Sequence, residues 1–177
     1  MIKKYVIYLI LTPVIVFGIP PNNEKILSSR LKGLENFLGK PYKGEFLNSS
    51  QENPLFDMMF WERALNGNAV RILHSVNEGE YGGETIIMWN PDKNKLYSWY
   101  FNTGGSQSEG TVEIDTDHCL IIENVSKNKN GIKKVKTIYK YTRSGEINCK
   151  VKYFINNIWF DAHNHLYKQI DKKLIFK

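Results

Sequence analysis

Hydrophobic and polar residues alternate with a period of two along most of the chain, beginning near Tyr42. This is the period of a β-strand, because successive side chains of a strand point to opposite faces of the sheet. Residues that favour tight turns recur at intervals of about ten positions, as at Asn66-Gly67 and Ser144-Gly145. The pattern predicts ten strands, at residues 43–49, 55–65, 69–78, 82–90, 95–102, 106–115, 118–126, 133–143, 146–155 and 158–169.

The connections between these predicted strands are too short to hold crossover helices. Each strand should therefore pair with its predecessor in an antiparallel meander. An open sheet of this width would expose two unpaired edges, and closure into a barrel removes them. The sequence thus predicts an all-β fold, a single antiparallel up-and-down β-barrel of about ten strands over residues 42–170.

Two neighbouring predicted strands, 133–143 and 146–155, indicate which side chains face inward. One parity holds the lysines: Lys134, Lys136, Lys140, Lys150 and Lys152. The other parity holds mostly apolar and aromatic residues: Val135, Thr137, Tyr139, Tyr141, Cys149, Val151 and Tyr153. Because charged side chains are costly to bury, the lysines should face water and the second set should face the barrel interior.

The N-terminal segment has a different pattern. Lys3 and Lys4 precede an uncharged apolar stretch that ends near Gly18, with Pro20 beyond it. This order is typical of a secretory signal peptide, and the stretch is shorter than the roughly 20 residues of a membrane span. We expect residues 1–18 to be a signal peptide and the protein to be secreted or periplasmic, with no stable membrane span after cleavage; an uncleaved helical anchor is the alternative.

Residues 19–41 are predicted to form a linker and a capping helix. Leucines recur at helical spacing at positions 27, 31, 34 and 38, and Gly39 follows as a stop signal. The spacing predicts one short amphipathic helix over residues 24–38. Its leucine face needs an apolar surface, so we expect the helix to close one end of the barrel.

Composition and charge narrow the class of protein. The chain has 177 residues, 42% of them hydrophobic, which suits one globular domain with a core. Its formal net charge is +6, and loss of Lys3 and Lys4 with the leader would lower it by two, so the charge is too modest to favour a nucleic-acid partner. No nucleophile elbow or phosphate-binding glycine loop is present, so the sequence favours a binding protein over an enzyme. It predicts no particular oligomeric state.

The two cysteines, Cys119 and Cys149, are an even number, as is usual in an oxidising compartment. The predicted meander, however, separates them by one intervening strand. Their backbones should then lie about 9.6 Å apart, twice the strand spacing of about 4.8 Å, whereas a disulfide usually needs Cα atoms within about 7 Å. We therefore expect two unpaired thiols.

Several turn and packing residues resemble those of bacterial secreted lipocalin-like families of unknown function. The resemblance covers residues 34–168 and includes these runs: Leu65-Asn66-Gly67-Asn68-Ala69, Gly82-Gly83, Trp89-Asn90-Pro91-Asp92, Leu96-Tyr97-Ser98-Trp99-Tyr100-Phe101-Asn102 and Gly110. It implies a calycin-type barrel with a central cavity. Members of this superfamily often bind small hydrophobic molecules, but the resemblance implies no catalytic residues.

Aromatic residues in the predicted strands are the candidate ligand-binding residues: Trp89, Tyr139, Tyr141, Tyr153 and Trp159. A barrel of this size can hold one small ligand, and such pockets combine apolar walls with a few polar groups. We expect a small hydrophobic molecule as the partner. The alternative is a solid barrel, filled by its own rings, that acts as a surface interaction module.

Asp161, His163 and His165 occupy alternate positions in the last predicted strand and should share one face. Two imidazoles and a carboxylate at this spacing can bind a transition metal, to which His74 or His118 could add a ligand. Haem held by His163 or His165 is a second version of the same hypothesis. The simpler interpretation is that this strand has a solvated polar face and that the protein has no cofactor.

Overall fold

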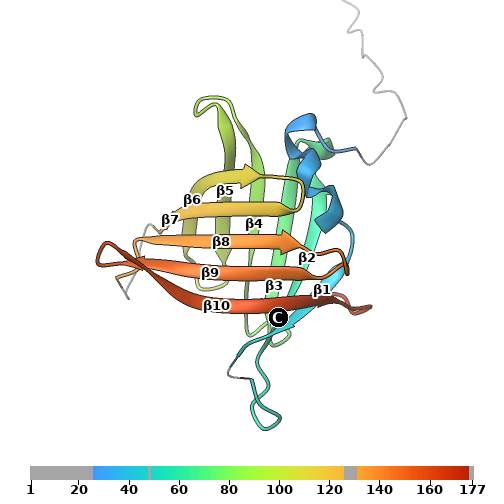
Figure 1. Cartoon of the computed structure of the whole chain (residues 1–177), viewed down its shortest axis with the longest axis vertical. Helices are drawn as coiled ribbons and strands as arrows, with labels where there is room; N and C mark the ends of the chain where they lie inside the picture. The colour runs from blue at the N-terminus through green and yellow to red at the C-terminus, as the bar shows by residue number, and fades with distance from the viewer. Residues whose placement is uncertain (1–25, 48, 126–130, 176–177) are drawn as a thin grey trace, which may run out of the picture.

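A computed structural model describes residues 26–47, 49–125 and 131–175, so the predicted signal peptide lies outside the described residues. Ten antiparallel strands follow one another along the chain and close into a barrel (Figure 1). The strands are β1 (Pro41–Glu45), β2 (Phe56–Ala64), β3 (Ala69–Val76), β4 (Tyr81–Asn90), β5 (Lys95–Asn102), β6 (Gln107–Ile114), β7 (His118–Val125), β8 (Lys134–Tyr141), β9 (Ile147–Ile155) and β10 (Ile158–Gln169). The ten predicted strands and the all-β barrel are confirmed.

Each strand pairs with its neighbour in sequence, and β1 closes the barrel against β10, with Tyr42 opposite Gln169. The predicted meander is therefore confirmed. In Figure 1 the strands β8–β10 run across the direction of β2–β4, which lie on the other side of the barrel. The predicted facing of β8 and β9 also holds, because Thr137, Tyr139 and Tyr153 line the interior.

The predicted capping helix over residues 24–38 is not confirmed as an α-helix. The chain instead forms a 3₁₀ helix, η1 (Ser29–Phe37), and a second short one, η2 (Leu65–Gly67), joins β2 to β3. A 3₁₀ helix has three residues per turn, so the residues buried on one face of η1 are Leu31, Leu34 and Phe37. The α-helical spacing had predicted Leu38 on the buried face, and in the 3₁₀ helix Phe37 lies on that face instead. No helix within the described residues is long and apolar enough to cross a bilayer.

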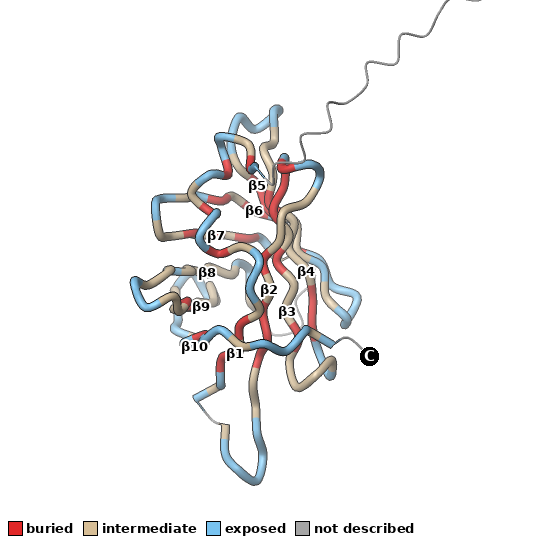
Figure 2. Tube along the Cα trace, turned by 90° about the vertical axis from the view of Figure 1, so that its right-hand side faces the viewer, coloured by how far each residue is buried: buried red, intermediate tan, exposed pale blue. Residues whose placement is uncertain are grey.

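The core is densest at the end of the barrel where η1 packs. The Phe37 ring stacks on the Trp61 ring, with centroids 4.8 Å apart, and Trp61 meets Tyr139 edge to face at 5.0 Å. Buried aliphatic residues from several strands complete the cluster: Val70, Ile87, Val112 and Ile147. In Figure 2 the buried positions follow the strands and η1, whereas the exposed positions gather on the loops.

Cys119 and Cys149 are both buried and unpaired. In the sheet register each lies opposite Tyr139, on β7 and β9 respectively, so the β8 strand separates them. The prediction of two free thiols is therefore confirmed. The intervening strand that the prediction rested on is β8.

The last strand contains a β-bulge. The register with β9 shifts between Asp161, which lies opposite Lys152, and His163, which lies opposite Val151, so Ala162 is an extra residue. A bulge reverses which parity of a strand faces inward. His163 therefore shares the inner face with Val151, whereas Asp161 shares the outer face with Lys152. The prediction that Asp161 lies on the same face as the two histidines is wrong for this reason.

Candidate functional site

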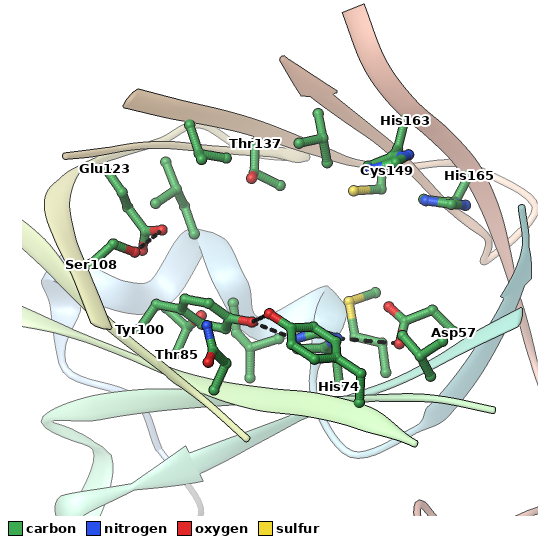
Figure 3. Close-up of a pocket in the computed structure, with 18 of the residues that line it drawn as sticks. Asp57, His74, Thr85, Tyr100, Ser108, Glu123, Thr137, Cys149, His163 and His165 are labelled. Carbon is green, nitrogen blue, oxygen red and sulfur yellow. Dashed lines mark hydrogen bonds and ion pairs between the residues drawn. The ribbon is translucent and has the colours of Figure 1, made fainter. Parts of the chain in front are cut away.

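The barrel contains a cavity of about 1190 Å³. It lies beyond the aromatic cluster of the closed end, since Tyr139 lines it and no residue of η1 does. One part of its lining is aliphatic: Met59, Ile72, Val76, Ile121, Val125, Ile132, Val135 and Val151. The lining also includes three groups of hydrogen-bonded polar side chains, which Figure 3 shows on different walls.

The first polar group is a chain of hydrogen bonds along β2–β5. His74 lies between Asp57, at 3.3 Å from Nδ1 to Oδ1, and Tyr100, at 2.9 Å from Nε2 to the hydroxyl. Because a carboxylate only accepts, Nδ1 carries the hydrogen and Nε2 accepts from Tyr100. The Tyr100 hydroxyl also lies 3.0 Å from that of Tyr81. Burial, and then the hydrogen bond with Tyr81, raises the pKa of Tyr100, so its phenol stays protonated.

Tyr167 holds the other oxygen of Asp57. Its hydroxyl donates to Asp57 Oδ2 at 2.8 Å, and the ring lies flat against β1 at Gly44. A Cβ on Gly44 would lie 3.0 Å from a carbon of the Tyr167 ring, so the missing side chain makes room for it. Both oxygens of this carboxylate are thereby satisfied within the protein.

The second polar group surrounds Glu123 on β7. Ser98 donates to Oε1 at 3.0 Å and Ser108 to Oε2 at 2.9 Å, and Glu123 is only 8% exposed. Ser98, Gly110 and Glu123 lie opposite one another on β5, β6 and β7. Because Gly110 has no side chain, the Glu123 side chain can extend over β6 to Ser98. A Cβ on Gly110 would lie 1.8 Å from the Ile122 carbonyl oxygen, so no other residue fits there.

Burial has the largest effect on the pKa of Glu123. It raises the pKa of this carboxyl, and the two serine hydroxyls only partly oppose the shift. Of the described residues, none places a basic side chain in an ion pair with Glu123. This carboxyl therefore lies in the cavity wall without a positive partner there.

The third polar group is the pair His163 and His165 on β10. Their rings stack with centroids 5.9 Å apart, and Phe46 meets both edge to face. His165 Nδ1 lies 3.2 Å from the Glu45 carbonyl oxygen, and His163 Nε2 lies 3.1 Å from the Tyr153 hydroxyl. Burial, and then the neighbouring His165, lowers the pKa of His163.

Asp161 stands apart from this pair. It is on the outer face, where it forms an ion pair of 2.9 Å with Lys152 that lowers the pKa of Asp161 through a hydrogen bond and the lysine charge. Of the two histidines named as further ligands, His74 is in the hydrogen-bonded chain and His118 pairs with Asp117 at the start of β7. In the described ranges no three His, Cys, Asp or Glu side chains are grouped so as to hold a metal ion.

The five predicted ligand-binding residues occupy three different places. Tyr139 and Tyr153 line the cavity. Tyr141 and Trp89 are at the closed end, the first edge-on to Phe37 and the second beneath the Arg30 guanidinium. Trp159 is on the outer face, beneath Lys136, because the bulge reverses the facing of this part of β10.

Sequence reasoning missed Asp57, Tyr100 and Glu123. The available signal was a polar residue at an inward position of an otherwise apolar strand. Glu123 shares its parity with Ile121 and Val125, which made it the only charged residue on that face of its strand. The hydrogen-bond partners of these three residues come from distant positions in the chain, and no pattern in the sequence indicated them.

No protein-family model matches the chain, and no curated protein matches it either. The closed ten-strand antiparallel barrel is nevertheless compatible with a calycin-like fold. What the protein does has to be inferred from the cavity and its three polar groups.

Proposed function

We propose that the protein is an exported, lipocalin-like barrel that binds a small, largely apolar molecule inside its cavity. The observation that supports this most directly is the cavity of about 1190 Å³ within a closed barrel. Native interiors are packed like organic crystals and leave few voids larger than a water molecule. A space of this size, with an aliphatic wall and a few fixed polar groups, is instead typical of a ligand pocket.

The same observation disfavours the solid barrel that would act through its surface. Such a barrel needs its interior aromatic side chains to meet across the centre. Of the predicted candidates, Trp159 faces outward, and Tyr141 and Trp89 are at the closed end. Tyr139 and Tyr153 line the remaining space without filling it.

Export belongs to the same proposal. It is supported by the pattern of residues 1–18, in which Lys3 and Lys4 precede an uncharged apolar stretch. A barrel outside the cytoplasm would carry or capture its ligand there. Mass spectrometry of the N-terminus of the protein purified from its own host tests export, and retention of residues 1–18 would contradict it.

Ligand binding is tested with the neutral dye Nile red, which fluoresces in apolar surroundings, and by native mass spectrometry of protein from its own host. Thr137 faces the cavity between Ile121 and Val151. We expect saturable binding of one dye molecule to the wild type, and a loss of at least about tenfold in affinity in Thr137→Trp, because the indole fills the space. Lys140→Trp, on the exposed face of the same strand, is the matched control.

Dye binding that is equal in Thr137→Trp and Lys140→Trp would show that the cavity is not the binding site. The proposal would be contradicted if the wild-type protein bound no dye and carried no molecule from its host. Circular dichroism establishes that both variants are folded before they are compared.

A haem-binding barrel is the second candidate, and the surroundings of His165 favour it. A carbonyl oxygen only accepts, so His165 Nδ1 donates to Glu45, and Nε2 is left as a base with no hydrogen-bond partner in the described chain. A histidine that ligates a metal usually has this arrangement, because the backbone bond fixes its tautomer. With Asp161 on the outer face, His165 is the candidate ligand and His163 its neighbour.

Titration of the purified protein with hemin tests this candidate. A stoichiometric Soret band that is lost in His165→Ala and kept in His163→Ala is the expected result. A band that is absent in the wild type, or unchanged in His165→Ala, would remove haem from consideration.

A further inference from the structure

The cavity lining contains acidic side chains and three histidines, although the chain as a whole has a positive formal charge. The formal net charge is +6, yet the described residues that line the cavity include two carboxyl groups, Asp57 and Glu123, and no lysine or arginine. The lysines of β8 and β9 are on the outer face, where Lys134 and Lys136 cover aromatic rings. A low-dielectric interior that contains carboxylates and lacks cations attracts a positively charged guest.

The two carboxyl groups are not equivalent. Asp57 forms hydrogen bonds with the His74 imidazole and with the Tyr167 hydroxyl. Glu123 has only two neutral serine hydroxyls as partners. Burying a carboxylate without a cation is costly, and proteins rarely retain such a group without a function. Glu123 is therefore the carboxylate whose positive partner is missing.

We propose that the ligand of the cavity is an organic ammonium ion, whose N–H groups bind the Glu123 carboxylate between Ser98 and Ser108 while its apolar body lies against the aliphatic wall. The inference rests on the proposed function and specifies its ligand class.

The geometry around Glu123 suits this ligand. Each carboxylate oxygen accepts one serine hydrogen and has a further lone pair, and an ammonium group has three hydrogens to donate. Tyr100 and Tyr139 line the same cavity, and aromatic faces attract cations. Charge-assisted bonds of this kind are about twice as strong as neutral ones, and water screens them little inside the barrel.

The competing interpretation is that Glu123 is a neutral acid that completes a structural hydrogen-bond network with the two serines. Such a group would be indifferent to the charge of the ligand. The two interpretations therefore differ in how the protein ranks ligands that share one apolar chain and differ only in their head group.

Displacement of Nile red by decylammonium, 1-decanol and decanoate makes this comparison. We expect decylammonium to displace the dye from the wild type at concentrations at least about tenfold below those of decanol, with decanoate the weakest. In Glu123→Gln the advantage of decylammonium over decanol should disappear, while Nile red still binds. Glu113→Gln, an exposed carboxyl on the neighbouring strand β6, is the matched control and should keep the advantage.

Equal displacement by decylammonium and decanol, with Nile red bound, would overturn the inference and leave the proposed function standing. Absence of Nile red binding to the wild type would overturn the proposed function itself. An ammonium advantage that survives in Glu123→Gln would place the cation elsewhere and equally overturn the assignment.

A second measurement uses the wild type alone, so it does not depend on whether the Glu123→Gln variant folds. Amide NMR spectra are recorded with saturating decylammonium and with saturating decanol. The two spectra should differ most at Glu123 and its register neighbours Gly110 and Ser98. Differences that cluster around Asp57 or His163 instead would contradict the assignment.

Discussion

At the scale of single residues, the cavity wall contains polar side chains whose burial costs free energy of folding. Glu123 is buried with neutral partners only, the hydroxyls of Ser98 and Ser108. Asp57 is likewise buried, with His74 and Tyr167 as its hydrogen-bond partners. Polar groups in a core cost stability unless they are fully satisfied, so their presence on cavity walls points to binding rather than to folding.

The cost of Glu123 should be visible in the pH dependence of stability. Because its pKa is raised in the folded state, the native protein holds this proton more tightly than the unfolded chain does. Its effect is therefore most favourable below the unfolded pKa of about 4.3 and is lost as pH rises from there through the folded pKa. We expect the free energy of unfolding of Glu123→Gln, measured in urea, to rise relative to that of the wild type as the pH increases above about 4.3.

The control is Glu113→Gln, whose exposed carboxyl should leave the comparison with the wild type nearly independent of pH. A Glu123→Gln difference that stays constant over the same range would mean that folding does not raise the pKa of this carboxyl.

At the scale of secondary structure, two irregular elements decide the shape of the site. The bulge in β10 turns His163 and His165 inward and keeps Asp161 and Trp159 outside. The 3₁₀ helix η1 closes the other end, with Leu31, Leu34 and Phe37 buried against the strands. A fully buried leucine contributes about 1.5–3 kcal/mol through burial alone, so η1 is an integral part of the core.

Truncation of one η1 side chain tests this role. Leu34→Ala should lower the free energy of unfolding by about 2–5 kcal/mol, because Leu34 is fully buried and its removal leaves a cavity at the closed end. Glu35→Ala, next to it on the exposed face, should change stability by less than about 0.5 kcal/mol. Equal effects of the two substitutions in urea unfolding would mean that η1 does not pack on the barrel.

At the scale of the whole molecule, the barrel is divided along its axis. The stacked pair Phe37 and Trp61, with Tyr139 edge-on to Trp61, fills one end, and the cavity begins on the far side of Tyr139. The filled end supplies packing between the strands, and the hollow end contains the cavity in which we propose that a ligand binds. Cys119 and Cys149 lie on either side of Tyr139 in the register, on strands that separate only if the barrel opens.

The Cys119 thiol reports on opening of the barrel, because it is fully buried and, unlike Cys149, does not line the cavity. Burial raises the pKa of both Cys119 and Cys149, and the thiolate is the reactive form. We expect alkylation of Cys119 by iodoacetamide, followed by mass spectrometry, to be at least about 100-fold slower in buffer than in denaturing urea, with both cysteines labelled after unfolding. Rapid labelling of Cys119 in buffer would show that the sheet opens locally around β7, and a mass lower by two hydrogens would reveal a disulfide.

Local patterns in the sequence determined much of the architecture. Alternation and turn residues placed all ten strands and their order, and the lysine parity of β8 and β9 identified the inward face that contains Tyr139 and Tyr153. The number of strands between Cys119 and Cys149 favoured two free thiols over a disulfide. These features follow from the sequence because each depends on residues close together in the chain or on the strand count between them.

The tertiary structure alone decided where along the barrel each inward residue lies and which distant residues meet. Tyr139 and Tyr141 are two residues apart, yet only the first lines the cavity, because the tilt and stagger of the strands set the height of each position. Ser98 and Glu123 meet across Gly110 through the register of three strands. The bulge at Ala162 left no trace in the alternation, because one extra residue changes the facing of a strand without changing its composition.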